Sequence, residues 1–222
     1  MFGYGMSATP RAAFLLVFVL GSMPAGQQQE QVQQVTVNER VNVSLYYESL
    51  CPDSVRFVIN QLQPTWQSMA PYMNIRFIPF GKSASGKYSD GTIVFFCQHG
   101  PKECSGNKMQ SCALSLLSTQ DSQVQFVTCV MSKSDPSLAG PQCAAQVGLN
   151  YQDVEQCYQS SQGTNLQLAA EQETNKIRRP LRFVPTVVYN DHLDQRKQDD
   201  SLDDFKGALC KHIAQPPPEC SE

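Results

Sequence analysis

The 222-residue chain has little net charge and lacks basic clusters. Its 17 Lys and Arg against 20 Asp and Glu leave a formal net charge of −3, with a sequence pI near 5.6. No run of Lys and Arg occurs anywhere along it. Surfaces that bind nucleic acids are strongly basic, so this composition argues against a nucleic-acid partner.

Motifs of several common enzyme classes are also missing. The sequence contains no Ser–His–Asp signature, no glycine-rich phosphate loop and no evident pair of catalytic carboxylates. It therefore gives no sign of a hydrolase triad, of phosphate binding through a glycine-rich loop, or of paired-carboxylate acid–base chemistry.

Long apolar runs are scarce as well. The one near the N-terminus, Ala12 to Leu20, follows Arg11 and precedes small and helix-breaking residues. It is too short to cross a bilayer, which takes about 20 apolar residues. The pattern predicts a secretory signal peptide over residues 1–26, with a membrane anchor as the alternative. We expect a Gln-rich flexible leader at 27–37, then a single domain at 38–222 without a membrane span, in the secretory pathway and lysosomal or secreted.

Cysteine, in contrast, is abundant, with nine in the chain. In an oxidising compartment such a set forms a disulfide framework. The odd number leaves one thiol over, and if that thiol is Cys51 the other eight can form four bridges. Their pairing cannot be read from sequence, because eight cysteines allow about a hundred connectivities. The disulfide candidates are Cys97, Cys104, Cys112, Cys129, Cys143, Cys157, Cys210 and Cys220.

Cys51 lies where a β-rich run, 41–47, gives way to a helix-like segment. Pro52 suits the first turn of a helix, so we expect Cys51 at a helix N-terminus, where N–H groups and the dipole favour a thiolate. The carboxylate of Asp53 opposes a negative charge on the sulfur. The alternative to a free, reactive Cys51 is a buried Cys51 that forms half of a disulfide. Ser54 stands where a dithiol motif has its second sulfur, and a serine cannot resolve a mixed disulfide.

The hydrophobic pattern predicts an α/β fold with a thioredoxin-like outline. The chain opens as strand, helix and strand, a unit whose strands lie parallel. Residues from about 100 to 178 read as a helical, disulfide-rich insertion between the two halves of the fold. Residues 82–92 read as a loop or hairpin. Strands are predicted at 35–47, 73–80, 92–96 and 183–189, and helices at 52–68, kinked by Pro64, and at 201–213.

Three further features have competing interpretations. Pro185 opens an apolar strand, and composition alone favours a trans strand-entry proline over a cis bond. Thiols and His99 between Cys97 and Cys112 could bind zinc, but their spacing fits no reliable zinc template and the compartment favours disulfides, so we predict no metal. Asn42 begins a glycosylation sequon inside the first strand, and an unused triplet is the alternative. His192 and His212 read as a turn residue and a surface helix residue.

The segment Cys97-Gln98-His99-Gly100, followed by Glu103-Cys104, Asn107 and Cys112, resembles the signature of the gamma-interferon-inducible lysosomal thiol reductase family. The resemblance extends through Tyr-Tyr-Glu-Ser-Leu-Cys-Pro-Asp-Ser at 46–54 and the later cysteines to Val184-Pro185, covering about 38 to 220.

This resemblance implies a thioredoxin-like fold with a disulfide-linked helical insertion. It also implies reduction of protein disulfides in acidic endolysosomal compartments, and glycosylation. By position it gives Cys51 the role of the nucleophile and Pro185 that of a cis-proline facing the substrate. Ser54 departs from the reductase pattern and resembles the Cys-X-X-Ser variants of invertebrate members.

The leading hypothesis is therefore a thiol–disulfide oxidoreductase acting on disulfide-containing proteins. Cys51 would form a mixed disulfide that a substrate thiol, or an external thiol such as glutathione or cysteine, resolves without any bound cofactor. The first alternative is a redox-impaired, immune-related binding module that contacts or traps partners without turnover. The second is a disulfide-stapled structural protein with no accessible thiol.

Overall fold

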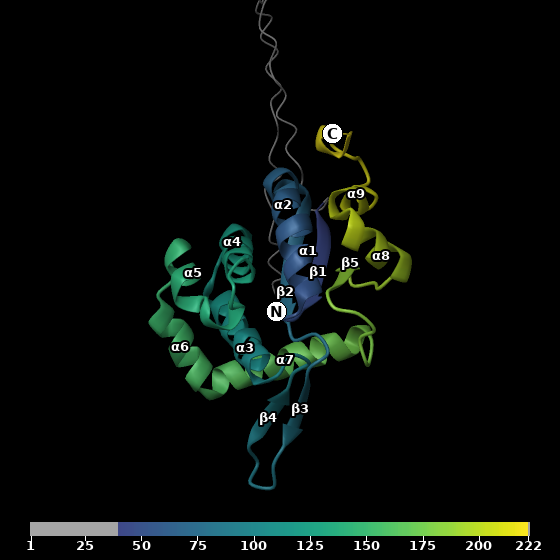
Figure 1. Ribbon diagram of the computed structural model, residues 1–222. Helices are drawn as coiled ribbons and strands as arrows, with labels where there is room; N and C mark the ends of the chain where they lie inside the picture. Colours follow the sequence, from purple (N-terminus) through teal and green to yellow (C-terminus); the bar gives the residue numbers. More distant parts are fainter. Residues whose placement is uncertain (1–39, 222) are drawn as a thin grey trace, which may run out of the picture. The chain divides into compact units, whose positions relative to one another are not determined.

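A three-stranded sheet in the order β2–β1–β5 forms the centre of the fold (Figure 1). Strands β1 (Val41–Tyr47) and β2 (Met73–Pro79) pair in parallel along their whole length. Strand β5 (Thr186–Tyr189) pairs antiparallel with β1. The adjacent residues Leu45 and Tyr46 of β1 point to opposite faces of the sheet, and both are buried, so the central strand is covered on both faces.

The structure, a computed structural model, describes residues 40–221. The predicted signal peptide and the Gln-rich leader lie outside the described residues. Among residues 40–221, none of the helices is long and apolar enough to cross a membrane.

The connection from β1 to β2 is one helical segment with a change of pitch. It consists of α1 (Pro52–Phe57), the π-helical η2 (Val58–Leu62), α2 (Gln63–Met69) and the 3-10 turn η3 (Ala70–Tyr72). Pro64 falls in the first turn of α2. A proline inside a helix lacks an N–H and clashes with the carbonyl four residues back, and the wider π turn before it accommodates both effects. The helix expected over 52–68 is present in this form.

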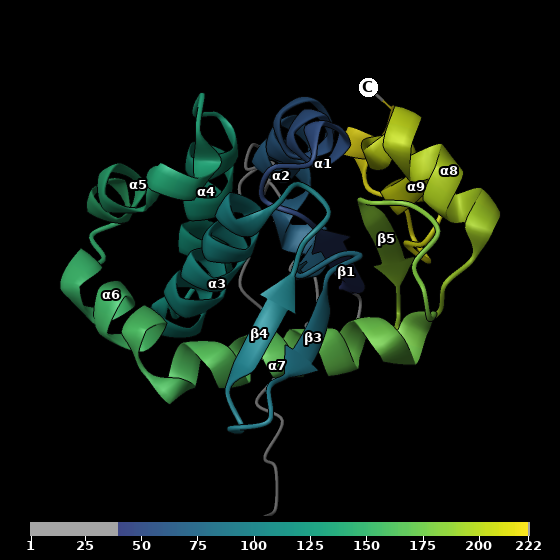
Figure 2. The same ribbon diagram turned by 60° about the horizontal axis from the view of Figure 1, so that its bottom comes forward.

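Helices fill the chain between 101 and 177. They are α3 (Pro101–Leu116), α4 (Gln120–Met131), the 3-10 turn η4 (Pro136–Leu138), α5 (Gly140–Gln146), α6 (Tyr151–Gln159) and α7 (Ser161–Ile177). Disulfide Cys112–Cys157 joins α3 to α6, and Cys129–Cys143 joins α4 to α5. Figure 2 shows that α7 then runs from this helical group across to the side of β5, so it returns the chain to the sheet.

A hairpin, β3 (Ala84–Lys87) with β4 (Ile93–Phe96), lies between β2 and α3. It projects from the body of the fold in Figure 1. The glycine- and serine-rich stretch expected to be a loop or hairpin thus forms the hairpin. Directly after β4, disulfide Cys97–Cys104 connects the incoming loop to the first turn of α3.

The C-terminal part corrects two predictions. Strand β5 begins at Thr186 and not at 183, because the preceding residues form a loop that ends in a cis Val184–Pro185 bond. The single helix expected over 201–213 is instead α8 (Gln195–Asp203) followed by α9 (Phe205–Cys210). The side chain of Asp204 accepts from the Gly207 N–H at 2.8 Å and caps α9, which is why the helix breaks there.

The last segment packs back on the core. Phe205 of α9 meets Phe57 of α1 edge to face, with ring centroids 5.3 Å apart, and both rings are buried. Disulfide Cys210–Cys220 then fixes the terminal 3-10 turn η5 (Pro218–Ser221) to α9. Helix α1, which follows Cys51, is thereby packed against α9.

Candidate active site

Cys51 is the N-cap residue of α1, with Pro52 in the first turn. Its backbone is extended (φ −69°, ψ 121°), as expected where a strand and loop enter a helix. The other eight cysteines form the four disulfides, and Cys51 is the free cysteine among the described residues. Its residue surface is 6% exposed, so a reacting sulfur would have to approach it closely.

The cis Val184–Pro185 bond lies opposite this sulfur. Cys51 Sγ is 3.6 Å from the carbonyl oxygen of Val184. From α8, Gln198 Nε2 donates to the carbonyl of Pro185 at 2.7 Å, and Gln198 Oε1 accepts from the N–H of Val187. The buried side chain of Gln198 therefore fixes the proline loop from α8, while the loop faces Cys51 at the start of α1.

Ser54 and Asp53 each have a partner at the start of α1. Ser54 is buried, and its hydroxyl accepts from the backbone N–H of Glu48 at 3.3 Å. This bond secures the loop before the helix. Asp53 is paired with Arg56 at 2.8 Å on the surface, so its opposition to a thiolate is partly neutralised.

Glu48 brings a buried carboxyl to the same place. Its Oε1 accepts from the N–H of Lys82 at 2.6 Å. The neighbouring Gly81 has φ +60°, and a Cβ there would collide with Glu48 Cγ, so a glycine permits this close approach. Burial raises the pKa of Glu48 from 4.5 to about 7, although the Lys82 N–H acts in the opposite direction.

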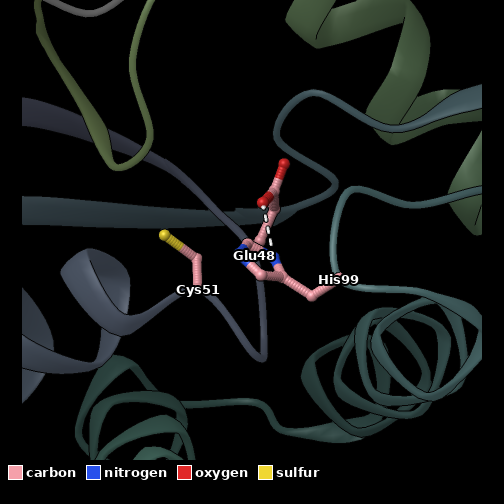
Figure 3. Close-up of side chains that lie close together, drawn as sticks. All are labelled: Glu48, Cys51 and His99. Carbon is pink, nitrogen blue, oxygen red and sulfur yellow. Dashed lines mark ion pairs between the residues drawn. The ribbon is translucent and has the colours of Figure 1, made fainter.

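His99 and Glu103 complete this cluster from the loop before α3 and from its first turn. Nδ1 of His99 is 2.6 Å from Glu103 Oε2, and the His99 backbone N–H donates to Glu103 Oε1 at 3.0 Å. The same Nδ1 is 3.4 Å from Glu48 Oε2. Glu103 is buried, whereas the His99 side chain is 32% exposed. Figure 3 shows the His99 ring beside the Glu48 carboxylate, with Cys51 next to both.

The start of α3 also fixes the loop that carries Glu48 and Cys51. Asn107 Oδ1 accepts from the N–H of Ser49 at 2.8 Å, and Ser49 Oγ donates to the carbonyl of Glu103 at 3.1 Å. Ser49, Glu103 and Asn107 are all fully buried. A Cβ on Gly106 would collide with Ser49 Oγ, so this glycine lets the helix approach the loop.

Two sets of side chains bear on metal binding. Cys97 and Cys104 form a disulfide, so neither supplies a thiolate to zinc. One ligand atom each from Glu48, Cys51 and His99 lie within 4.8 Å of one another, and among the described residues this is the set that could approach one ion. Glu103 engages Nδ1 of the imidazole and the Lys82 N–H engages Oε1 of the carboxylate, whereas Oε2 has no hydrogen-bond partner among the described residues. We interpret the cluster through its proton chemistry.

A groove of about 390 Å³ begins at the proline loop and runs along α1 toward α8. Pro185, Phe183 and Phe57 line it with apolar surface, and Asp53 and Arg56 form its charged edge. The Phe183 side chain contributes exposed aromatic surface. An apolar lining with a few charged side chains at its edge is typical of a ligand-binding groove.

The site contains residues that the sequence alone did not identify. The sequence gives no role to Glu48, places Glu103 only within a signature, and offers His99 only as part of that signature or as a zinc ligand. That signature was the available signal, since His99, Glu103 and Asn107 all prove to contact the loop around Cys51. His212, expected at the surface, is half-buried and stacks on the ring of Tyr189 with centroids 4.0 Å apart.

A free cysteine at the first strand-to-helix junction, facing a cis-proline before an antiparallel strand, defines a thioredoxin-like fold. Solved structures agree on the fold. Chlamydia trachomatis DsbA superposes with a TM-score of 0.53 at 14% identity, covering 79% of this chain and 89% of that one. The thiol–disulfide oxidoreductase MdbA from Actinomyces oris gives 0.53 at 13% identity, covering 81% and 83%.

Sequence relatives identify the family. Residues 42–147 match the family described as gamma interferon inducible lysosomal thiol reductase. A gamma-interferon-inducible lysosomal thiol reductase-like protein of Anopheles gambiae is 34% identical over 194 residues, covering 82% of this chain and 80% of the relative. The thiol reductase of Carassius auratus is 32% identical, covering 82% and 72%. The chain belongs to this family, and family and fold together support a thiol–disulfide oxidoreductase.

Proposed function

We propose that the protein reduces or exchanges disulfides of protein substrates through a mixed disulfide at Cys51. The observation that carries the proposal is one unpaired, N-cap cysteine set against cis Val184–Pro185 beside a peptide-sized groove. The N–H groups of the first turn of α1 stabilise a thiolate at this position. The backbone of an extended substrate would pair with the residues at Pro185, presenting its disulfide to the sulfur.

Release of the substrate would depend on a second thiol from outside the chain. Ser54 has no sulfur, and its hydroxyl is already bonded to the Glu48 N–H. The mixed disulfide is therefore attacked by another substrate thiol or by a small thiol such as glutathione or cysteine, which serves as the reductant. No bound cofactor takes part in this monothiol cycle.

The setting of this activity is proposed from the family. Relatives whose names include "lysosomal thiol reductase" occur in Mus musculus and Carassius auratus, which supports a lysosomal or secreted location. Asn42 is exposed on β1, which supports glycosylation at its sequon. A loss of mass on glycosidase treatment would measure that modification.

The test compares wild-type protein with Cys51→Ala at about pH 5, where ordinary thiols are protonated. We expect wild type to reduce a protein disulfide over many turnovers with a small thiol present, and Cys51→Ala to lose the activity. Equal rates in the two proteins would contradict the proposal. Ser54 also favours a second candidate, a trap that keeps its partner, and a single stoichiometric adduct without turnover would identify it.

A further inference from the structure

Glu48 is a buried carboxyl beside Cys51 with one oxygen left without a hydrogen-bond donor. The Lys82 N–H satisfies Oε1, whereas Oε2 has no hydrogen-bond partner among residues 40–221. Nδ1 of the His99 imidazole lies 3.4 Å from Oε2. An unsatisfied buried polar atom costs about 1–3 kcal/mol, and stability alone offers no reason to place one beside a reactive sulfur.

In acid, exchange between alkyl thiols and disulfides is accompanied by proton transfer. The attacking group is a thiolate and the group that leaves is also a thiolate. In acid an alkyl thiol, with a pKa of about 8.5, is almost entirely protonated. An attacking thiol must therefore lose a proton and a leaving thiolate must gain one. Cys51 is only 6% exposed, and a bound substrate would cover it further, so a proton carrier inside the site would assist both transfers.

We propose that the Glu48 carboxyl carries this proton, and that His99, anchored by Glu103, positions the carboxyl beside Cys51. The inference rests on the proposed function of Cys51. One atom each of Glu48, Cys51 and His99 lie within 4.8 Å of one another, so the carboxyl is close to the place where the disulfide exchange would occur. The His99 side chain is 32% exposed, which opens a route from the cluster to solvent.

The groups that face Glu48 come from four segments. His99 precedes α3, Glu103 lies in the first turn of α3, Lys82 follows β2, and Cys51 begins α1. The carboxylate of Glu103 opposes charge on Glu48, while His99 and Lys82 favour it, and burial outweighs both. With a pKa of about 7, Glu48 is a carboxylic acid in an acidic compartment, ready to donate.

The cycle then balances in protons and electrons. The Cys51 thiolate attacks the substrate disulfide, and the leaving substrate thiolate takes the Glu48 proton. A small thiol gives its proton to the Glu48 carboxylate and attacks Cys51 Sγ, and the second substrate thiolate leaves with that proton.

In the last step a second small thiol protonates Glu48 and attacks the small-thiol sulfur bound to Cys51. This releases the Cys51 thiolate and the disulfide of the small thiol. The substrate disulfide has gained two electrons and two protons from two molecules of external thiol.

The experiment measures single-step reaction of reduced protein with two disulfides at about pH 5. Hydroxyethyl disulfide has an alkyl leaving thiolate that needs a proton, whereas dithionitrobenzoate has an aryl thiolate that leaves without one. We expect Glu48→Gln to slow the alkyl reaction about 10-fold or more and the aryl reaction about 2-fold or less. His99→Gln, which disturbs the same cluster from another segment, should show a smaller effect with the same dependence on leaving group.

Glu48→Gln keeps an oxygen to accept the Lys82 N–H, and Glu155→Gln on the exposed face of α6 is the matched control. Circular dichroism checks that each variant folds. Equal losses with both disulfides, or no loss with the alkyl one, would overturn the role of Glu48 while leaving Cys51 as the nucleophile. A wild-type protein that reacts with neither disulfide would overturn the proposed function itself, and the role of Glu48 with it.

Discussion

The buried carboxyl of Glu48 makes the stability of the fold depend on pH in a direction unusual for a glutamate. Its pKa rises from 4.5 to about 7 on folding, so the folded state holds the proton more tightly than the unfolded chain. The contribution of Glu48 to the free energy of unfolding is therefore fully present at low pH. It is lost as pH rises from about 4.5 through about 7. A tenfold change in proton affinity corresponds to about 1.4 kcal/mol, which gives a loss of about 3 kcal/mol at most.

The perturbation that isolates this effect is Glu48→Gln, which cannot ionise but still accepts the Lys82 N–H. Urea unfolding at several values between about pH 5 and pH 8, in a Cys51→Ser background, gives the free energy of unfolding without thiol titration. Relative to Glu48→Gln, the protein that retains Glu48 should lose about 2–3 kcal/mol across this range. Parallel pH profiles for the two proteins, or a relative gain for Glu48 as pH rises, would refute the reasoning.

Two further substitutions test the neighbouring contacts. Ser54→Cys should supply a second thiol that forms a disulfide with Cys51, which mass spectrometry would detect. The variant should also reduce a protein substrate faster than wild type when external thiol is limiting. No gain in rate would point to a mechanism that never used an internal resolving thiol. Asn107→Ala leaves the buried Ser49 N–H unpaired and should lower the free energy of unfolding by about 1–3 kcal/mol. In denaturant titrations Asn165→Ala, exposed on α7, is the control, and equal stability of the two variants would argue against the contact.

Local patterns predicted the first half of the sheet well. The parallel pairing of β1 and β2 follows from a strand–helix–strand order whose periodicities are all contained in neighbouring residues. The position of Cys51 at the strand-to-helix junction could also be predicted, because Pro52 by itself indicates where the helix starts. Both features depend on short stretches of chain, which is why sequence reasoning reached them.

The C-terminal helices show where local patterns fail. Leu202, Phe205 and Leu209 follow a helical spacing that reads as one stripe. The stripe in fact crosses two helices, because the Asp204 carboxylate finds the N–H of Gly207 and starts a new helix. An aspartate favours the first turn of a helix and its cap alike, and sequence cannot tell which of the two it occupies.

The cluster around Cys51 was out of reach for a different reason. Glu48 and His99 are far apart in sequence and are neighbours because the chain returns, after the β3–β4 hairpin and at the Cys97–Cys104 disulfide, to the end of β1. The periodicity of the sequence does not predict such a long-range contact. For Pro185, composition alone favours a trans bond, whereas the family resemblance implies the cis bond that the structure has. Gln198 of α8 holds the loop that contains it.

These contacts give the signature that begins at Cys97 a physical explanation. Its disulfide closes the loop that presents His99, Glu103 anchors the imidazole, and Asn107 binds the backbone beside Glu48. The residues of the signature thus form the side of the site opposite α1, although they lie some distance from Cys51 in sequence. Substitutions within it should alter how protons reach the sulfur while the groove beside Pro185 stays intact, because none of its residues lines that groove. A change in leaving-group dependence without a change in substrate affinity is the result that would distinguish this role from peptide binding.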